Sequence, residues 1–174
     1  MRRGVLRTSP VVEAHVRQYV REDLESIVAL SLRAWAPVFA SLEEALGSEL
    51  FTRLRGDWRQ GQSTAIRQVL NDEAARAWVA QIDDRVAGFV AATLDPESDI
   101  GEISMVAVEP DRQRVGIGAA LTRTAIEWLR DSGMSVAMVE TGGDPGHLPA
   151  RRTYESTGFT RCVASLWRCR PHSA

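Results

Sequence analysis

The chain of 174 residues contains no lysine, because all 21 of its basic residues are arginines. This absence excludes mechanisms that need a lysine amine, such as the phosphate-binding lysine of a P-loop or the Schiff base of pyridoxal enzymes. Cysteine is scarce too, since Cys162 and Cys169 are the only two and do not form a Cys-x-x-Cys pair. Two cysteines are too few for a four-thiolate zinc site or a disulfide framework. We therefore expect no metal site and a reducing compartment, the cytoplasm.

An excess of positive charge and long apolar runs are also missing. The formal net charge is −2, so we expect no nucleic acid partner. No segment approaches the roughly 18 consecutive apolar residues of a membrane span, so we expect no membrane partner. Residues 1–10 carry three arginines without the apolar stretch of a signal peptide. We expect them to form a flexible leader before a single domain at residues 11–174.

The order of apolar patterns along the chain predicts an α+β fold with helices packed on a mixed sheet. Helical spacing comes first, then two short alternating runs joined by Asp83-Asp84 as a hairpin, then strands alternating with helices. The segment from Glu102 to Val139 is expected to be a parallel crossover. The predicted strands lie at residues 11–19, 77–82, 86–94, 100–108, 135–139 and 159–168, and the predicted helices at 24–35, 42–54, 61–70, 121–133 and 149–156.

One stretch combines a strand, a proline-terminated turn and a glycine-containing helix start, running from Val106 to Leu121. Glycines in the first helical turn let an anionic ligand approach the backbone, and the free N–H groups with the helix dipole favour phosphate. A P-loop is excluded by the missing lysine. The dinucleotide pattern G-x-G-x-x-G fits only its first two glycines, because Leu121 stands where the third should be. A glycine turn that only shapes the corner is the structural alternative.

The same stretch matches a third phosphate-binding pattern. The hexapeptide Gln113-Arg114-Val115-Gly116-Ile117-Gly118 fits Q/R-x-x-G-x-G/A, and here the sequence resembles the GNAT superfamily of acyl-CoA-dependent N-acyltransferases. A second block, from Pro149 to Phe159, resembles the family segment A-x-x-x-Y-x-x-x-G-F. Together the blocks extend the resemblance over about Trp78 to Arg168. It implies a three-layer fold with a mixed, mostly antiparallel sheet and a parallel strand pair at the acyl-CoA site.

The resemblance also implies how acetyl-CoA, the acyl donor, is bound. The backbone of Val106 and Val108 would pair with pantetheine as an added strand. His147 stands where family members often carry an asparagine that bonds the pantetheine arm; it either donates a similar hydrogen bond or is an ordinary loop histidine. The pyrophosphate would lie on the backbone of Gln113, Arg114, Val115, Gly116, Ile117, Gly118 and Ala119.

Two residues are catalytic candidates through the resemblance. Tyr154 would place its hydroxyl beside the sulfur and donate to the departing thiolate; the alternative is a packing role. Glu102 lies fourteen positions before Gly116, the spacing of the basic glutamate in histone-type members, and could instead be an exposed strand-end residue. Because strand side chains alternate, we expect Glu102 to share a face with Ser104 and Val106.

The function implied is transfer of an acetyl group from acetyl-CoA to a primary amine by direct attack. The acceptor could be a small molecule or a peptide, and homodimers are common in the family. A non-catalytic acyl-CoA sensor is the alternative. A tRNA- or ribosome-directed acyltransferase would need a basic face, whereas the arginines here are scattered. The N-terminal helices carry no family motif, and we expect the aromatic residues Trp35, Phe39 and Trp58 to be core rather than walls of an acceptor pocket.

Overall fold

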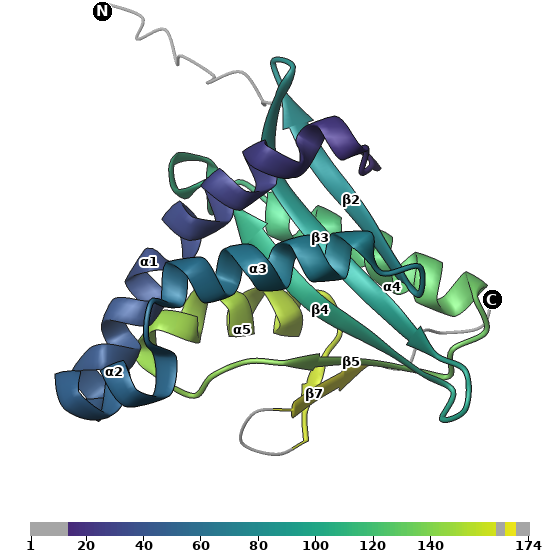
Figure 1. Ribbon diagram of the computed structural model, residues 1–174. Helices are drawn as coiled ribbons and strands as arrows, with labels where there is room; N and C mark the ends of the chain where they lie inside the picture. Colours follow the sequence, from purple (N-terminus) through teal and green to yellow (C-terminus); the bar gives the residue numbers. More distant parts are fainter. Residues whose placement is uncertain (1–13, 163–165, 170–174) are drawn as a thin grey trace, which may run out of the picture.

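The computed structural model describes residues 14–162 and 166–169. The predicted leader at residues 1–10 lies outside them. Seven strands form one sheet in the order β1-β2-β3-β4-β5-β7-β6 (Figure 1). Their bounds are β1 His15–Gln18, β2 Ala75–Ile82, β3 Arg85–Asp95, β4 Ile100–Val108, β5 Val136–Glu140, β6 Thr160–Arg161 and β7 Leu166–Cys169. All neighbours are antiparallel except β4 and β5, which are parallel. The predicted fold class and crossover are confirmed.

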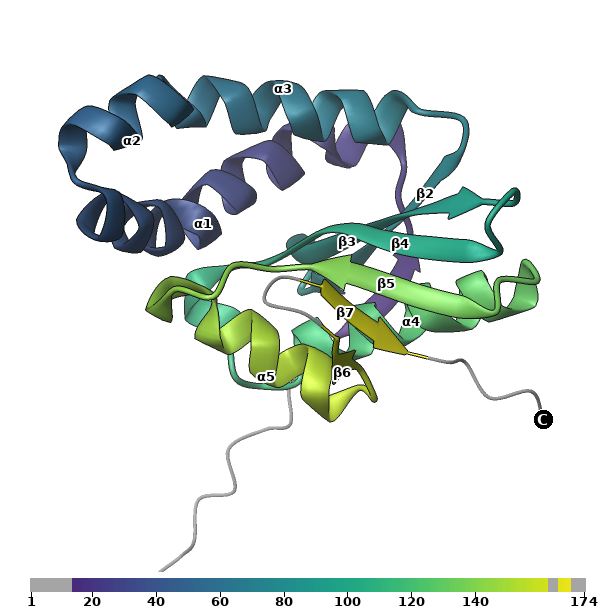
Figure 2. The same cartoon turned by 90° about the horizontal axis from the view of Figure 1, so that it is seen from below.

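Helices cover both faces of the sheet, as Figure 2 shows. On one face Ile27 and Leu30 of α1 and Ile66 of α3 pack with Phe89 of the central strand β3. On the other face the apolar stripe of α4 packs with Tyr154 of α5. Both clusters are almost fully buried, so the sheet is the middle of three layers. The helix bounds are α1 Leu24–Leu46, α2 Ser48–Arg55, α3 Trp58–Asn71, α4 Ile117–Asp131 and α5 Leu148–Ser156, and short 3-10 turns are η1 Arg21–Asp23, η2 Pro110–Arg112 and η3 Pro145–His147.

The first helix is longer than its sequence pattern predicts. The prediction placed one helix at residues 24–35 and a second from 42 to 54, but α1 continues through Pro37 and ends at Gly47. Pro37 removes one helical hydrogen bond. Packing on both sides of Pro37 outweighs this loss, since Trp35 lies against Phe89 of β3 and η3 packs on the second half of α1. The helix breaks where Gly47 takes a positive φ of 77°.

The hairpin between β2 and β3 is confirmed, and its turn residues explain its geometry. Asp83 and Asp84 both have positive φ, 47° and 60°. A two-residue turn with two positive φ angles matches the twist of the flanking strands. Aspartate tolerates this conformation better than most residues. The turn sets the register in which β3 becomes the buried centre of the sheet.

A buried ion pair fixes the corner between β1 and α1. Both carboxylate oxygens of Asp23 accept hydrogen bonds from Arg17, each 2.8 Å long, and one also accepts from the backbone N–H of Val20 at 3.0 Å. The Asp23 side chain is only 8% exposed. The hydrogen bond from Arg17 lowers the pKa of Asp23, although burial opposes this. The contrasting pair is Glu25–Arg67, which has the same two-point geometry but a glutamate that is 75% exposed.

We expect Asp23→Asn to lower the free energy of unfolding at pH 7 by about 2 kcal/mol, because the hydrogen bonds from a charged partner are lost in a buried place. A lowered folded-state pKa contributes stability above the pKa of an unfolded aspartate, about 3.9, and this contribution disappears as the pH falls through the folded value. Urea unfolding should therefore show the two proteins converging below about pH 4. The control Glu25→Gln should change stability much less. Equal losses in both variants would contradict the role given to burial.

Candidate functional site

The parallel pairing of β4 with β5 stops halfway along β4. The paired positions run from Ile100 with Val136 to Ile103 with Val139, whereas β4 itself continues to Val108. At this point the adjacent β3 residues Ala91 and Ala92 pair with Met105 and Ile103 of β4. Ser104, which lies between these two, is therefore an extra residue in β4. Such a β-bulge bends the strand and increases its twist. Beyond Ile103, β4 and β5 therefore separate, and one edge of β4 is left without a strand partner.

The backbone groups on this unpaired edge belong to Val106 and Val108. The N–H of Glu109 donates to the carbonyl of Ala87 across the β3–β4 ladder. Hydrogen-bonded and non-bonded pairs alternate in an antiparallel ladder, so the groups of Val106 and Val108 point away from β3. The indole N–H of Trp35 donates to the Val106 carbonyl at 3.2 Å, and the Gln113 amide donates to the Val108 carbonyl at 3.0 Å. The strand N–H groups on the edge stay available to a ligand.

The loop that follows β4 delivers the chain to the N-terminus of α4. Arg114 and Gly116 have positive φ, 63° and 92°, and α4 begins at Ile117 with no acidic residue in its first turn and no side-chain cap. The first amides of a helix lack partners inside the helix and carry partial positive charge. Residues 113–119 thus form the glycine turn and helix start that the sequence predicts, and the binding of a pyrophosphate there stays a prediction.

Gly118 joins this loop to two other parts of the site. A Cβ placed on Gly118 would lie 3.6 Å from Thr153 of α5 and 3.7 Å from Val108 of β4. The start of α4, the open edge of β4 and the helix that carries Tyr154 therefore meet at one corner. Tyr154 is buried, its ring centroid is 5.7 Å from that of Phe159, and it belongs to the same core as Val106 and Ile117. Burial raises the pKa of Tyr154 to about 12, so the phenol keeps its proton and can donate.

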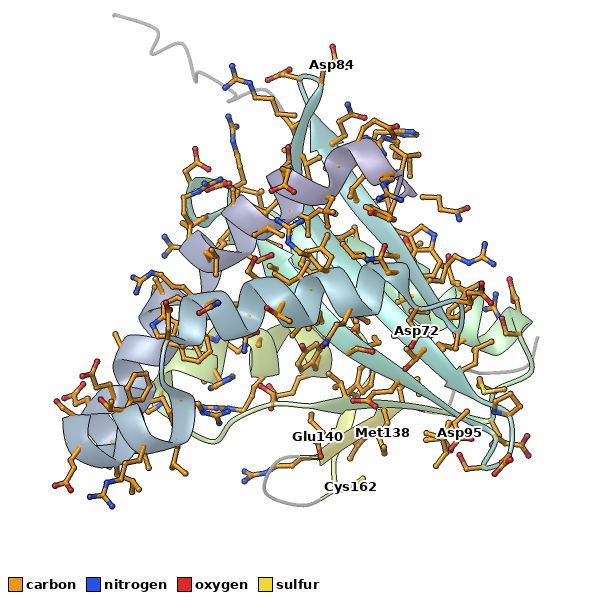
Figure 3. The ribbon with its side chains drawn as sticks, viewed as in Figure 1. Asp72, Asp84, Asp95, Met138, Glu140 and Cys162 are labelled. Carbon is orange, nitrogen blue, oxygen red and sulfur yellow. The ribbon has the colours of Figure 1, made fainter. Side chains whose placement is uncertain are left out.

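Glu102 lies on the face of the sheet that α1 and α3 cover. It pairs with Thr93 and Met138, and Glu140 follows Met138 on the same face of β5 (Figure 3). The Glu102 side chain is partly buried, and its pKa is raised first by burial and then by the charge of Glu140. These two carboxylates face the helices that carry no family motif.

One sequence prediction about Glu102 is wrong. Glu102 was expected to share a face with Ser104 and Val106, but the bulge at Ser104 shifts the alternation by one residue. Met105 packs with the cluster under α1 and α3, whereas Val106 packs with the cluster around α4. Glu102 and Val106 therefore lie on opposite faces. A strict period of two cannot reveal an inserted residue.

His147 lies at the end of η3, in the connection from β5 to α5. Its Nδ1 is bonded to the carboxylate of Asp144, and η3 packs against α1. The structure places the ring beyond the end of β5, on the side where β4 and β5 separate. Whether the ring contacts pantetheine stays a prediction.

Sequence reasoning missed several contributors to the site. Trp35 was expected in the core, and it does pack there, but its hydrogen bond to Val106 was not foreseen. Asp144 carried no signal by itself, since its partner is defined only by the folded loop. Thr141, directly after β5, buries a hydroxyl that has no hydrogen-bond partner among the residues described. A buried polar atom without a partner is costly and indicates a place for a bound group.

Across residues 14–162 and 166–169 no three or more His, Cys, Asp or Glu side chains are arranged to hold a metal ion. Within that same part of the chain, no helix combines the length and the apolarity needed to cross a bilayer.

An unpaired strand edge that leads to an uncapped helix N-terminus offers backbone N–H groups, which are suited to carbonyl and phosphate oxygens. Comparison with known proteins agrees. The model of the acetyltransferase (GNAT) family matches residues 39–159, so the chain belongs to the GNAT family of acetyltransferases.

Relatives in sequence include two mycothiol acetyltransferases. That of Thermomonospora curvata is 38% identical over 94 residues, which are 54% of this chain and 31% of the relative. That of Pseudarthrobacter chlorophenolicus is 31% identical over 146 residues, 80% of this chain and 40% of the relative. The chain thus spans less than half the length of these relatives.

Solved structures share the fold. The ribosomal-protein-S18-alanine N-acetyltransferase of Escherichia coli superposes with a TM-score of 0.69 at 18% identity, covering 93% of this chain and 96% of the other. The PaiA N-acetyltransferase of Thermoplasma acidophilum, solved with coenzyme A, gives 0.67 at 15% identity and covers 91% and 99%. At these identities the likeness concerns the fold alone.

The two ends of α4 offer a matched test of the anion site. Gly116 and Gly133 have φ of 92° and 88°, and a Cβ at either position would meet no atom within 4 Å. An alanine in this conformation costs about 1 kcal/mol, so Gly116→Ala and Gly133→Ala should lower stability alike. Only Gly116→Ala should weaken coenzyme A, by at least about tenfold (about 1.4 kcal/mol), in calorimetric titration. Equal affinities in both variants would place the phosphates elsewhere.

Proposed function

We propose that the protein is an N-acetyltransferase that moves an acetyl group from acetyl-CoA to a primary amine by direct attack. The observation that carries the proposal is the continuity of the unpaired β4 edge with the uncapped start of α4. These two features are in line along the chain, from Val106 to Gly118, and a pantetheine arm followed by a pyrophosphate has the matching order of groups. Family membership supports the same reaction class.

The donor fits the residues present. The strand N–H groups at Val106 and Val108 would pair with pantetheine amides as an additional strand would, and the hydroxyl of Thr141 would gain a partner at the place where the strands separate. The amides of residues 113–119 and the α4 dipole would hold the pyrophosphate. The reactive end of the donor then lies where β4 and β5 separate, and the Tyr154 phenol is the group we propose beside the sulfur.

The reaction joins the amine nitrogen to the thioester carbonyl carbon and breaks the carbon–sulfur bond. A primary amine with a pKa near 10.4 is mostly protonated at neutral pH, so it must lose a proton before it attacks. The sulfur leaves with the electron pair, and a hydroxyl that keeps its proton at neutral pH stabilises it. Tyr154 supplies such a hydroxyl.

The acceptor is proposed only as a class. The names of similar proteins point to two kinds of acceptor, mycothiol and an alanine of ribosomal protein S18. A cytoplasmic location is part of the proposal, and it is supported by two cysteines, Cys162 and Cys169, that form no disulfide.

The direct test measures free thiol released from acetyl-CoA with a panel of amines. Spermidine, kanamycin, Nα-blocked lysine and an alanine-ended peptide cover the amine classes. Thiol release with at least one of them supports the enzyme. Stabilisation by coenzyme A in a thermal shift, with no thiol release above the rate without amine, would support the acyl-CoA sensor instead.

The two tyrosines of the chain provide a matched pair for the acid role. Tyr154→Phe keeps the ring volume and removes the hydroxyl, so kcat should fall about 100-fold while stabilisation by coenzyme A is unchanged. Tyr19→Phe, at the end of β1 and outside the site, should keep wild-type kcat. Unchanged turnover of Tyr154→Phe at every pH would remove the acid role.

Glu102 stays our candidate for a carboxylate that meets the amine, either as base or by binding the ammonium group. Two carboxylates on one face, Glu102 and Glu140, would attract a cationic acceptor. The turn between β3 and β4 is also acidic, with Asp95, Glu97 and Asp99, but we do not propose that it meets the amine. Asp95 in this turn is bonded to Ser98 and to the backbone of Glu97, and it lies at the end of β4 opposite to the open edge.

Glu102→Gln should lower kcat/KM for the amine about tenfold, equivalent to about 1.4 kcal/mol, because a charge facing the acceptor is lost at nearly constant volume. The KM for acetyl-CoA should not change. Glu97→Gln removes an exposed charge from the acidic turn and should have no effect on either constant. Full activity of Glu102→Gln would remove Glu102 from the acceptor site.

A further inference from the structure

The connection from β5 to α5 holds an aspartate–histidine pair with one imidazole nitrogen left over. Asp144 and His147 are bonded through Oδ1 and Nδ1, and their side chains are 11% and 27% exposed. The other oxygen of Asp144 accepts from the backbone N–H of Gly146 at 3.0 Å. The carboxylate is therefore held in place, and it engages Nδ1 of the imidazole. Nε2 is free to meet another group.

The loop is shaped around this pair. Arg151 of α5 donates to the carbonyls of Gly142 and Asp144 at 2.6 and 2.9 Å. A Cβ on Gly142 would overlap both the His147 ring and the Asp144 carboxylate, so only glycine fits there while the pair is intact. The charged groups of this loop are Asp144, the residue that caps η3, and Arg151 of α5, and α1 contributes the hydroxyl of Ser41.

Helix α1 links the loop that holds the pair to the open edge of β4. Its Trp35 donates to Val106 on the open edge of β4, and its Ser41 accepts from the N–H of Gly146 at 3.1 Å. Six residues of helix separate these contacts, which is about 9 Å along the axis. The second half of α1 thus spans the gap between the separated strands, with the β4 edge at Trp35 and Gly146 at Ser41. His147 directly follows Gly146.

We propose that Nε2 of His147 accepts the proton of the acceptor ammonium group, with Asp144 as its positioning residue. This role rests on the proposed function. The freed nitrogen lone pair attacks the thioester carbon, and the sulfur leaves with the carbon–sulfur electrons and takes a proton from Tyr154. The nitrogen loses two protons in all: His147 passes the first to solvent, and the second replaces the proton that Tyr154 gave up. Glu102 and Glu140 are left with attracting the cation.

The decisive variant is His147→Asn, because an amide keeps a hydrogen-bonding group at this position and cannot act as a base. We expect kcat to fall about 100-fold while coenzyme A stabilises the variant as it does the wild type. His15→Asn, on the exposed edge strand β1, is the matched control and should behave like the wild type. His147→Gln provides a second amide if the asparagine variant does not fold.

Two further measurements separate proton transfer from a structural role. In His147→Ala, added imidazole should restore part of the lost turnover, since a free base replaces the missing ring. Asp144→Asn should lower kcat less than His147→Asn, with an unchanged KM for acetyl-CoA. Gly142→Ala should also lower kcat because it displaces the pair, whereas Gly143→Ala, where a Cβ meets no atom within 4 Å, should be neutral.

The results that would overturn the role of His147 differ from the result that would overturn the proposed function. Wild-type kcat and pH profile in His147→Asn would overturn the proposal, and so would a loss confined to the KM for acetyl-CoA, which would make His147 a pantetheine ligand. Failure of imidazole to restore any turnover in folded His147→Ala would also count against it. Absence of thiol release by the wild type with every amine would instead overturn the N-acetyltransferase function.

Discussion

The end of the β4–β5 pairing at Ile103 and Val139 is the constraint from which the site follows. A strand inside a sheet normally satisfies its N–H and C=O groups on both sides, and buried groups without partners are costly. At the inserted residue Ser104 the pairing with β5 ends, so the N–H and C=O groups on that side of β4 have no strand partner. Trp35 and Gln113 donate to two carbonyls of the open edge, and these two hydrogen bonds leave the N–H groups of the edge without an acceptor. An amide-bearing ligand has such acceptors, which is why we propose the open edge as the binding surface for pantetheine.

The helices on the two faces take different parts in this arrangement. On one face, α4 begins where the open edge ends, and the resulting corner with α5 carries Tyr154. On the other face, α1 crosses the gap and touches both of its sides, at Val106 and at Gly146. The carboxylates Glu102 and Glu140 lie on this second face, away from the phosphate-binding loop.

The parts of the site that the sequence predicted are those whose signal is local. Residues 113–118 and Tyr154 each lie within a short motif, and a glycine turn before an apolar stripe specifies a strand-to-helix corner wherever it occurs. The face of Val106 could not be predicted, because the bulge at Ser104 exists only through the pairing of β4 with β3. The length of α1 was missed for a related reason: Pro37 indicates a break locally, and tertiary packing overrides it. The Asp144–His147 pair lies within one loop, but the position of this loop against α1 depends on a contact between Ser41 and Gly146, which are 105 residues apart.

The crossing of the gap by α1 bears on how acceptor specificity can change in this fold. The segment from α1 to α3 covers the face of the sheet that carries Glu102 and Glu140, the two carboxylates proposed to attract the amine. Helix α1 of this segment also contacts the β4 edge through the indole of Trp35 and the backbone of Gly146 through the hydroxyl of Ser41. A transplanted segment without these two contacts would therefore alter the proposed donor site along with the proposed acceptor site. Chimeras that carry a foreign α1 but keep Trp35 and Ser41 would separate specificity for the acceptor from specificity for the acyl donor.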